Sequence, residues 1–244
     1  MRWRGLVGPL LLLLAWSVSA HYRLIDPFFF PEPLTTLRAL ARMLAHGTAR
    51  DVQATVLKTV WAFCLAAAAG VPAGLMLGSS PRAYRSVEFL VDLFRSIPPT
   101  AMFPLFLLLF GIGDAGKISV AAFSSGVIVL FNTAYGVLNA SQARIRAAKL
   151  MGAGRLAVFR HVIFWESLPQ TFVGLRTALS FCLLVIIVTE MFIGSSVGVG
   201  RAIIDAQITY DIPGLYAMIL LAGLIGYALN RLLALAERRL VRWN

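Results

Sequence analysis

The stretch TFVGLRTALSFCLLVIIVTEMFI, Thr171 to Ile193, is an apolar run long enough to cross about 30 Å of hydrocarbon as a helix. The composition of the whole chain agrees, because 59% of its residues are hydrophobic, 14% are charged and the mean hydropathy is +0.81. In soluble domains about a quarter of the residues are charged. The sequence therefore predicts an all-α, polytopic helical membrane protein and excludes a soluble globular domain.

Further apolar runs lie on both sides of this stretch. They are Leu6 to Ala20, Val56 to Leu77, Thr100 to Ile112, Val120 to Leu138 and Ile212 to Leu235. The run at Thr100 is short, but with Val87 to Phe94 before it, a helix broken at Pro98 and Pro99 would be long enough to span. Such a break frees backbone groups, which is tolerated only against protein or a water-filled path. We expect five to six transmembrane helices, five of them within residues 56–244.

Positive charge is concentrated on one predicted side of the membrane. Most of the 22 Lys and Arg residues lie before the first run, after the second, around residues 140–169 or at the C-terminus. By the positive-inside rule this side is the cytoplasm, so both termini are expected there. The net charge of +11 therefore follows from topology and predicts neither a nucleic-acid partner nor an anionic substrate.

Residues 1–55 contain two segments, each with two interpretations. Met1 to Ala20 is either a retained first span, which we favour, or a signal peptide with a Val-Ser-Ala cleavage site. Thr36 to Thr55 has apolar residues at helical spacing, and is either an interfacial helix on the outer surface or a plain connector. In the second apolar run, Gly70, Gly74 and Gly78 share one helix face and predict the close approach of a neighbouring backbone.

A basic, amphipathic insert, ASQARIRAAKLMGAGRLAVFRHVIFWESLP, covers Ala140 to Pro169. A first short helix is predicted by the helical spacing of Ala143, Ala147, Leu150 and Met151. We expect it to end in a left-handed cap at Gly152, to be followed by a second short helix over Leu156 to Ile163, and the next span to start at Ser167. The insert is either a knob that a soluble partner holds or an amphipathic loop on lipid headgroups.

Polar residues inside the predicted spans are few. Glu190 is the only acidic residue well inside an unbroken span, and exposing it to lipid would cost roughly 2.5 kcal/mol or more. We favour a structural hydrogen bond from Glu190 to a neighbouring helix or subunit over a role as a proton carrier, and it is also a candidate for the pathway entrance. Asn132, Ser180 and Thr189 are weaker pathway candidates, because single polar residues in spans commonly bond to a neighbouring helix.

Signals of catalysis are lacking in the sequence. It contains no G-x-x-x-x-G-K-[ST] phosphate loop, so the chain cannot itself hydrolyse a nucleotide by that chemistry. Its three histidines do not have metal-binding spacing. We predict a protein that is not an enzyme and that needs no cofactor or metal.

The run RAAKLMGAGRLAVFRHVIFWESLPQTFVGLR, Arg146 to Arg176, resembles the cytoplasmic coupling loop of permease subunits in bacterial ABC importers that work with a solute-binding protein. In that family the loop begins with Glu-Ala-Ala and has a Gly a few residues on. Ala147, Ala148 and Gly152 match these positions, whereas Arg146 stands where the acidic residue is usual. The resemblance extends through FRSIPPTAMFPLFLLLFGIG and VTEMFIGSSVGVG, and is greatest to the nitrate, sulfonate, taurine and bicarbonate group, which includes importers of vitamin precursors.

The resemblance implies a permease core at residues 56–244 in the bacterial inner membrane, with the coupling loop at residues 140–169. The implied partners are ATP-binding cassette ATPase subunits on the cytoplasmic side, a periplasmic or lipid-anchored solute-binding protein, and a second permease. That second permease is either another copy of this chain, which we favour, or a relative. The implied ATPase-coupling residues are Arg146, Ala147, Ala148, Lys149, Gly152, Ala153 and Leu156. The alternative function is a gradient-driven secondary transporter or channel that uses Glu190.

Overall fold

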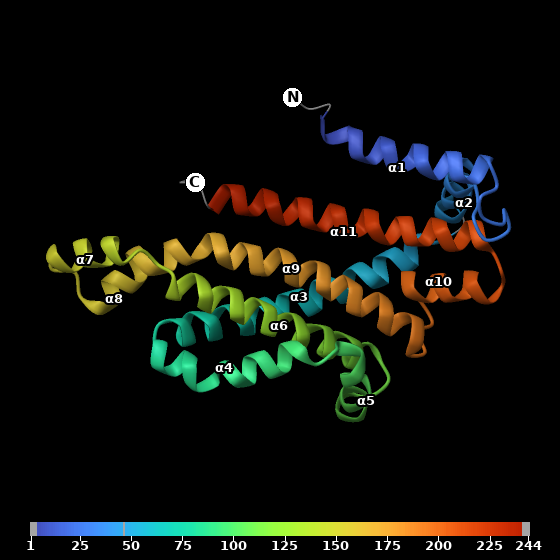
Figure 1. Ribbon diagram of the computed structural model, residues 1–244. Helices are drawn as coiled ribbons and strands as arrows, with labels where there is room; N and C mark the ends of the chain where they lie inside the picture. The colour runs from blue at the N-terminus through green and yellow to red at the C-terminus, as the bar shows by residue number, and fades with distance from the viewer. Residues whose placement is uncertain (1–3, 46, 241–244) are drawn as a thin grey trace.

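The computed structural model describes residues 4–45 and 47–240, and these residues form helices and no strands (Figure 1). The helices are α1 (Arg4–His21), α2 (Pro33–Ala45), α3 (Ala49–Gly78), α4 (Pro81–Ser96), α5 (Pro99–Phe110), α6 (Asp114–Leu138), α7 (Gln142–Leu150), α8 (Arg155–Val158), α9 (Phe164–Phe192), α10 (Val199–Ile208) and α11 (Ile212–Leu240). A π-helical turn, η1 (Phe159–Ile163), joins α8 to α9. The predicted all-α membrane fold is confirmed.

Four helices of the described chain are long and apolar enough to span a membrane: α3, α6, the continuous helix from Arg155 to Phe192, and α11. The α4–α5 pair would make a fifth, although it is bent by 97° at its break. The apolar part of α1, Val7–His21, is shorter than these spans. The described residues therefore provide four to five spans, and the sixth expected span rests on the short α1.

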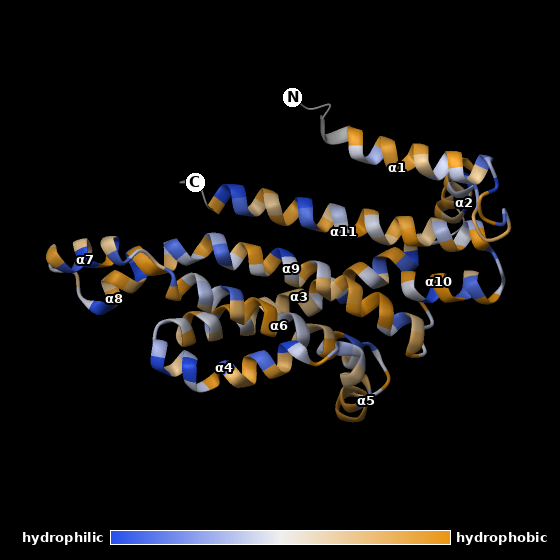
Figure 2. Cartoon of the chain, in the orientation of Figure 1, coloured by the Kyte–Doolittle hydropathy of each residue, from blue (hydrophilic) through white to orange (hydrophobic). Residues whose placement is uncertain are grey.

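The long helices lie side by side, α2, α7, α8 and α10 lie at the two ends of the bundle, and α4 and α5 lie along α6 (Figure 1). We call the end that carries α7 and α8 the loop end, and the end that carries α2 and α10 the α10 end. Hydrophobic residues cover most of the long helices, whereas hydrophilic residues gather at the C-terminal end of α11 (Figure 2).

The centre of the bundle is the contact between α3 and α6. A Cβ atom added at Gly70, Gly74 or Gly78 would lie 2.6–2.7 Å from a backbone oxygen of α6. The glycines thus let the two backbones touch, and the close approach predicted from their spacing is confirmed.

One predicted helix start is wrong. The next span does not begin at Ser167, because the helix continues from Arg155 through η1 into α9 with Pro169 inside it. The Ser167 hydroxyl donates to the Phe164 carbonyl within the same helix, at 2.8 Å, instead of capping a new one. The apolar run Val56 to Leu77 lies within α3, which starts earlier, at Ala49, and whose polar first turns face other helices at the α10 end.

The amphipathic stretch Thr36 to Thr55 is not a plain connector. It contributes most of α2 and the first turns of α3. Leu40 and Met43 of α2 pack against a buried cluster that includes Met218 and Leu221 of α11. This packing closes the α10 end of the bundle.

Candidate functional site

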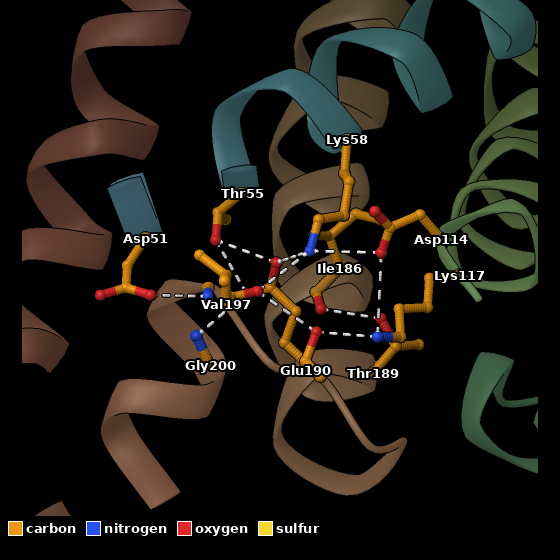
Figure 3. Close-up of polar contacts among 12 residues, drawn as sticks. Asp51, Thr55, Lys58, Asp114, Lys117, Ile186, Thr189, Glu190, Val197 and Gly200 are labelled. Atoms are coloured by element: carbon orange, nitrogen blue, oxygen red, sulfur yellow. Dashed lines mark hydrogen bonds and ion pairs between the residues drawn. The ribbon is translucent and has the colours of Figure 1, made fainter. Parts of the chain in front are cut away.

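Glu190, near the end of α9, is fully buried and surrounded by hydrogen-bond donors (Figure 3). Its carboxylate accepts hydrogen bonds from Lys58 Nζ at 2.7 Å, Thr55 Oγ1 at 2.8 Å and the Gly200 backbone N–H at 3.0 Å. The first two donors belong to α3 and the third to α10. A buried carboxylate needs such a paired cation and hydrogen bonds, since burying it alone is costly. Glu190 therefore links three helices.

A second buried lysine extends this group of charges to α6. Lys117 is 2% exposed; its Nζ donates to Ser195 Oγ at 2.8 Å and lies 3.9 Å from Asp114 Oδ1. Lys58 Nζ lies 3.5 Å from the same Asp114 oxygen, so the two lysines share one carboxylate. With Glu190, the group contains two cations and two anions, which balance.

The turn between α9 and α10 wraps around the Glu190 side chain. Gly198 has a φ of +148°, and a Cβ there would collide with the Glu190 carboxylate. The Gly198 N–H donates to Asp51 Oδ1 at 2.8 Å, and the next N–H, of Val199, donates to Thr55 Oγ1 at 2.9 Å. Glycine is therefore required at residue 198 for both conformation and space.

The other predicted pathway residues lie in three different places. Thr189 is buried next to Glu190, but its hydroxyl donates to the Ile186 carbonyl of its own helix, at 2.7 Å. Ser180 accepts a hydrogen bond from Asn230 of α11 at 2.8 Å. Asn132 lies elsewhere, at the break between α4 and α5.

That break borders a cavity of about 510 Å³. Its lining comes from the end of α4 and the break (Phe94, Arg95, Ser96, Ile97, Pro98, Pro99), from α6 (Ser124, Ile128, Phe131, Asn132) and from α9 (Thr177, Phe181). The Asn132 side chain donates to the Ile128 carbonyl and accepts from Gln170 Nε2, both at 2.9 Å. The structure thus brings the helix break and Asn132 together and places Glu190 outside this cavity.

The segment of residues 140–169 folds around a small core of its own. Ala140, Ile145, Ala148 and Val158 are buried in it. Gly152 follows α7 with a φ of +85°, so the predicted left-handed conformation is present. Of the seven predicted coupling residues, Ala148 is buried and Ala153 half-buried, and the other five are exposed.

The buried face of α7 differs from the predicted one. Leu150 is 89% exposed and Met151 82%, whereas Ile145 and Ala148 face the loop core. The four residues whose spacing predicts the helix, Ala143, Ala147, Leu150 and Met151, are all exposed. Leu156 is 78% exposed as well, and we call these three exposed apolar residues of the loop, Leu150, Met151 and Leu156, the apolar tip.

Sequence reasoning missed the partners of Glu190. Lys58 lies within the predicted run Val56 to Leu77, and Glu190 lies in another predicted span. Because charged residues inside spans pair with one another, the sequence could have predicted an ion pair between these two residues. Asp114 and Lys117 fell between predicted spans, and no local signal places them beside Glu190.

Residues 70–242 match the family described as the binding-protein-dependent transport system inner membrane component. The chain belongs to this family. It is 31% identical over 215 residues to a probable ABC transporter permease of Brucella abortus (strain 2308), which covers 88% of this chain and 86% of the relative. It is 29% identical over 245 residues to the taurine transport system permease protein TauC of Escherichia coli (strain K12), which covers 98% and 89%.

The fold is also that of a solved transporter. A structure of the MetNI methionine ABC transporter in an inward-facing conformation matches with a TM-score of 0.66 and 23% identity, over 80% of this chain and 94% of that chain. Aliphatic-sulfonate and nitrate permeases are among the relatives of this chain, which confirms the resemblance to that group. The chain is a multi-pass inner-membrane subunit of an ABC importer, a transport component and not an enzyme.

Proposed function

We propose that residues 140–169 receive the ATPase subunits and that two copies of this chain form the solute pathway between them. The observation that carries this proposal is the apolar tip of Leu150, Met151 and Leu156. In Figure 1, α7 and α8 extend past the ends of α3 and α6, away from the spans. Such a position favours a soluble partner over lipid headgroups.

Apolar contact and shape dominate the proposed joint. Fully burying a Leu or Met side chain stabilises a contact by roughly 1.5–3 kcal/mol. The neighbouring Arg146 and Lys149 are exposed, and exposed ion pairs contribute only about 0–1 kcal/mol. We therefore expect a cleft in the ATPase that is apolar inside, with acidic residues at its edge.

This docking assigns the two ends of the bundle to the two sides of the membrane. The loop end faces the cytoplasm, as does the C-terminal end of α11, and a membrane-crossing α1 puts the N-terminus on the same side. The α10 end then faces the periplasm, where a periplasmic or lipid-anchored binding protein delivers the solute. Solute selection belongs mainly to that protein.

In this proposal Glu190 holds helices together and does not carry protons. Its pairing with Lys58 at 2.7 Å supports the structural role. A gradient-driven carrier would instead stop transporting on Glu190→Gln while remaining independent of any ATPase.

A pull-down of the tagged chain from native membranes in mild detergent tests the proposal, with mass spectrometry and an ATPase assay on the eluate. We expect an ATPase to co-purify, and Gly152→Asp to abolish its recovery, because the change strains a left-handed residue and adds a negative charge at the tip. Gly152→Asn, which tolerates this conformation, separates strain from charge. Gly113→Asp, in open space at the α10 end, is the control for the added charge alone, because Gly113 is not left-handed (φ −74°). Full ATPase recovery with Gly152→Asp would overturn the proposed docking.

A further inference from the structure

Glu166, at the start of α9, holds the beginning of α7. Its Oε2 accepts a hydrogen bond from the Ser141 backbone N–H at 2.5 Å, and its Oε1 lies 3.1 Å from Arg144 Nε. Ser141 is the N-cap of α7, and its hydroxyl accepts from the Arg144 N–H at 3.4 Å. The Glu166 carboxylate is 13% exposed and lies where the dipole of α7 favours negative charge.

The same region fixes α6 to α9. A Cβ added at Gly136, near the end of α6, would lie 2.9 Å from the Ser167 carbonyl oxygen and 3.0 Å from Gln170 Cβ. At Gly136 the two helices therefore approach so closely that a side chain would not fit there. Asn132 and Gln170 add a hydrogen bond one turn further along.

On its other side the loop is set apart from the bundle. A cavity of about 960 Å³ lies between the end of α3, at Leu75 and Met76, and the loop residues Lys149, Leu156 and Phe159. The loop core instead packs on η1, which continues into α9. Force on α7 thus reaches the spans through its short connection to α6, through the loop core on η1, and directly through Glu166 at the start of α9.

We infer that Glu166 is a positioning residue that couples α7 to α9, so that movement of α7 carries α6 and α9 together. These two helices form one wall of the 510 Å³ cavity, opposite the α4–α5 break. The movement therefore changes the width of that cavity. This inference rests on the proposed docking of the ATPase on residues 140–169.

A simpler role for Glu166 is to cap α7 and stabilise the loop. A cap alone predicts that removing the carboxylate weakens assembly with the ATPase, and that every assembled complex still responds fully to nucleotide. Coupling predicts that assembly persists while the response of the cavity is lost.

The test uses the purified complex with a reporter cysteine at Thr177, on the cavity wall, in a Cys64→Ala background. The rate of maleimide labelling is measured before and after the ATPase is trapped with ATP and vanadate. With Glu166 intact, we expect trapping to change the rate about fivefold or more, a common size for coupling between sites. With Glu166→Ala we expect the ATPase still to be trapped, but the labelling rate to stay the same before and after trapping. Glu166→Gln, which keeps an acceptor for Ser141, should restore most of the response.

Glu237→Ala is the matched control, because Glu237 also pairs with α9, at Arg176, but does not contact α7. It should respond like the parent chain. A full response with Glu166→Ala would overturn the coupling role and leave the docking proposal standing, whereas a parent chain that recovers no ATPase would refute the docking itself. If the Glu166→Ala chain does not assemble with the ATPase, Arg144→Ala is tested in its place. We expect the change in labelling rate on trapping to fall at least about twofold, because one ion pair to Glu166 is lost. An unchanged labelling response in Arg144→Ala would overturn the inference.

Discussion

Replacing Lys58 by Met would leave Glu190 buried without its closest cation. Breaking a buried ion pair from one side costs about 3–5 kcal/mol, because the remaining charge stays uncompensated. Glu190 would keep its hydrogen bonds from Thr55 and Gly200, so we expect the lower end, about 3 kcal/mol. For a chain of 244 residues, this corresponds to a fall in Tm of roughly 6–12 °C.

Glu190→Gln should cost less than Lys58→Met. The amide keeps an acceptor for Thr55, and Lys58 keeps Asp114 at 3.5 Å, so no buried charge is left alone. The double variant Lys58→Met with Glu190→Gln should recover part of the stability lost in Lys58→Met, since it removes both charges together.

The assay is thermal unfolding of the purified chain in mild detergent, followed by the fraction that remains monodisperse after heating. Arg201→Ala is the control, because Arg201 pairs with Asp205 at the same end of the bundle but at an exposed site. Its Tm should change by about 1 °C, as expected for an exposed pair. A Tm for Lys58→Met within about 2 °C of the parent would refute the argument that Lys58 compensates the buried charge of Glu190. A larger fall in Tm for Glu190→Gln than for Lys58→Met would refute it as well.

Two further outcomes follow from the packing and from the loop. Gly74→Ala should lower stability by about 1–3 kcal/mol, because its Cβ would lie 2.6 Å from the Leu130 carbonyl oxygen; Gly223→Ala, a helical position with open space, should be neutral or stabilising in the same melting assay. Met151→Ser at the apolar tip should weaken ATPase binding about fivefold or more, measured as Kd by surface plasmon resonance, whereas the Tm of the chain should not change. Equal Tm values for the two glycine variants, or an unchanged Kd for Met151→Ser, would contradict the respective argument.

Features set by neighbouring residues could be predicted from the sequence. The long apolar runs indicated the spans, the spacing of Gly70, Gly74 and Gly78 indicated close helix packing, and Gly152 indicated a left-handed turn. Each depends on a periodicity or on a single backbone requirement, which a local stretch of sequence contains.

Features set by distant residues could not be predicted in the same way. Glu190 and Lys58 are 132 residues apart, and nothing near either one specifies the other. The buried face of α7 was also missed, because an alanine-rich helix has little contrast between its faces. The face of α7 that is buried is determined by Val158 and its neighbours, because Ile145 and Ala148 pack against them.

The helix from Arg155 to Phe192 also acts as a lever. Its 38 residues correspond to a rod about 57 Å long at 1.5 Å per residue, nearly twice the thickness of the hydrocarbon layer. A tilt of about 5° about one end of a rod of that length moves the other end by roughly 5 Å, about one helical turn. Small rotations at the proposed ATPase site would therefore be large displacements beside Glu190, because one continuous helix, which includes η1 and Pro169, connects the two ends.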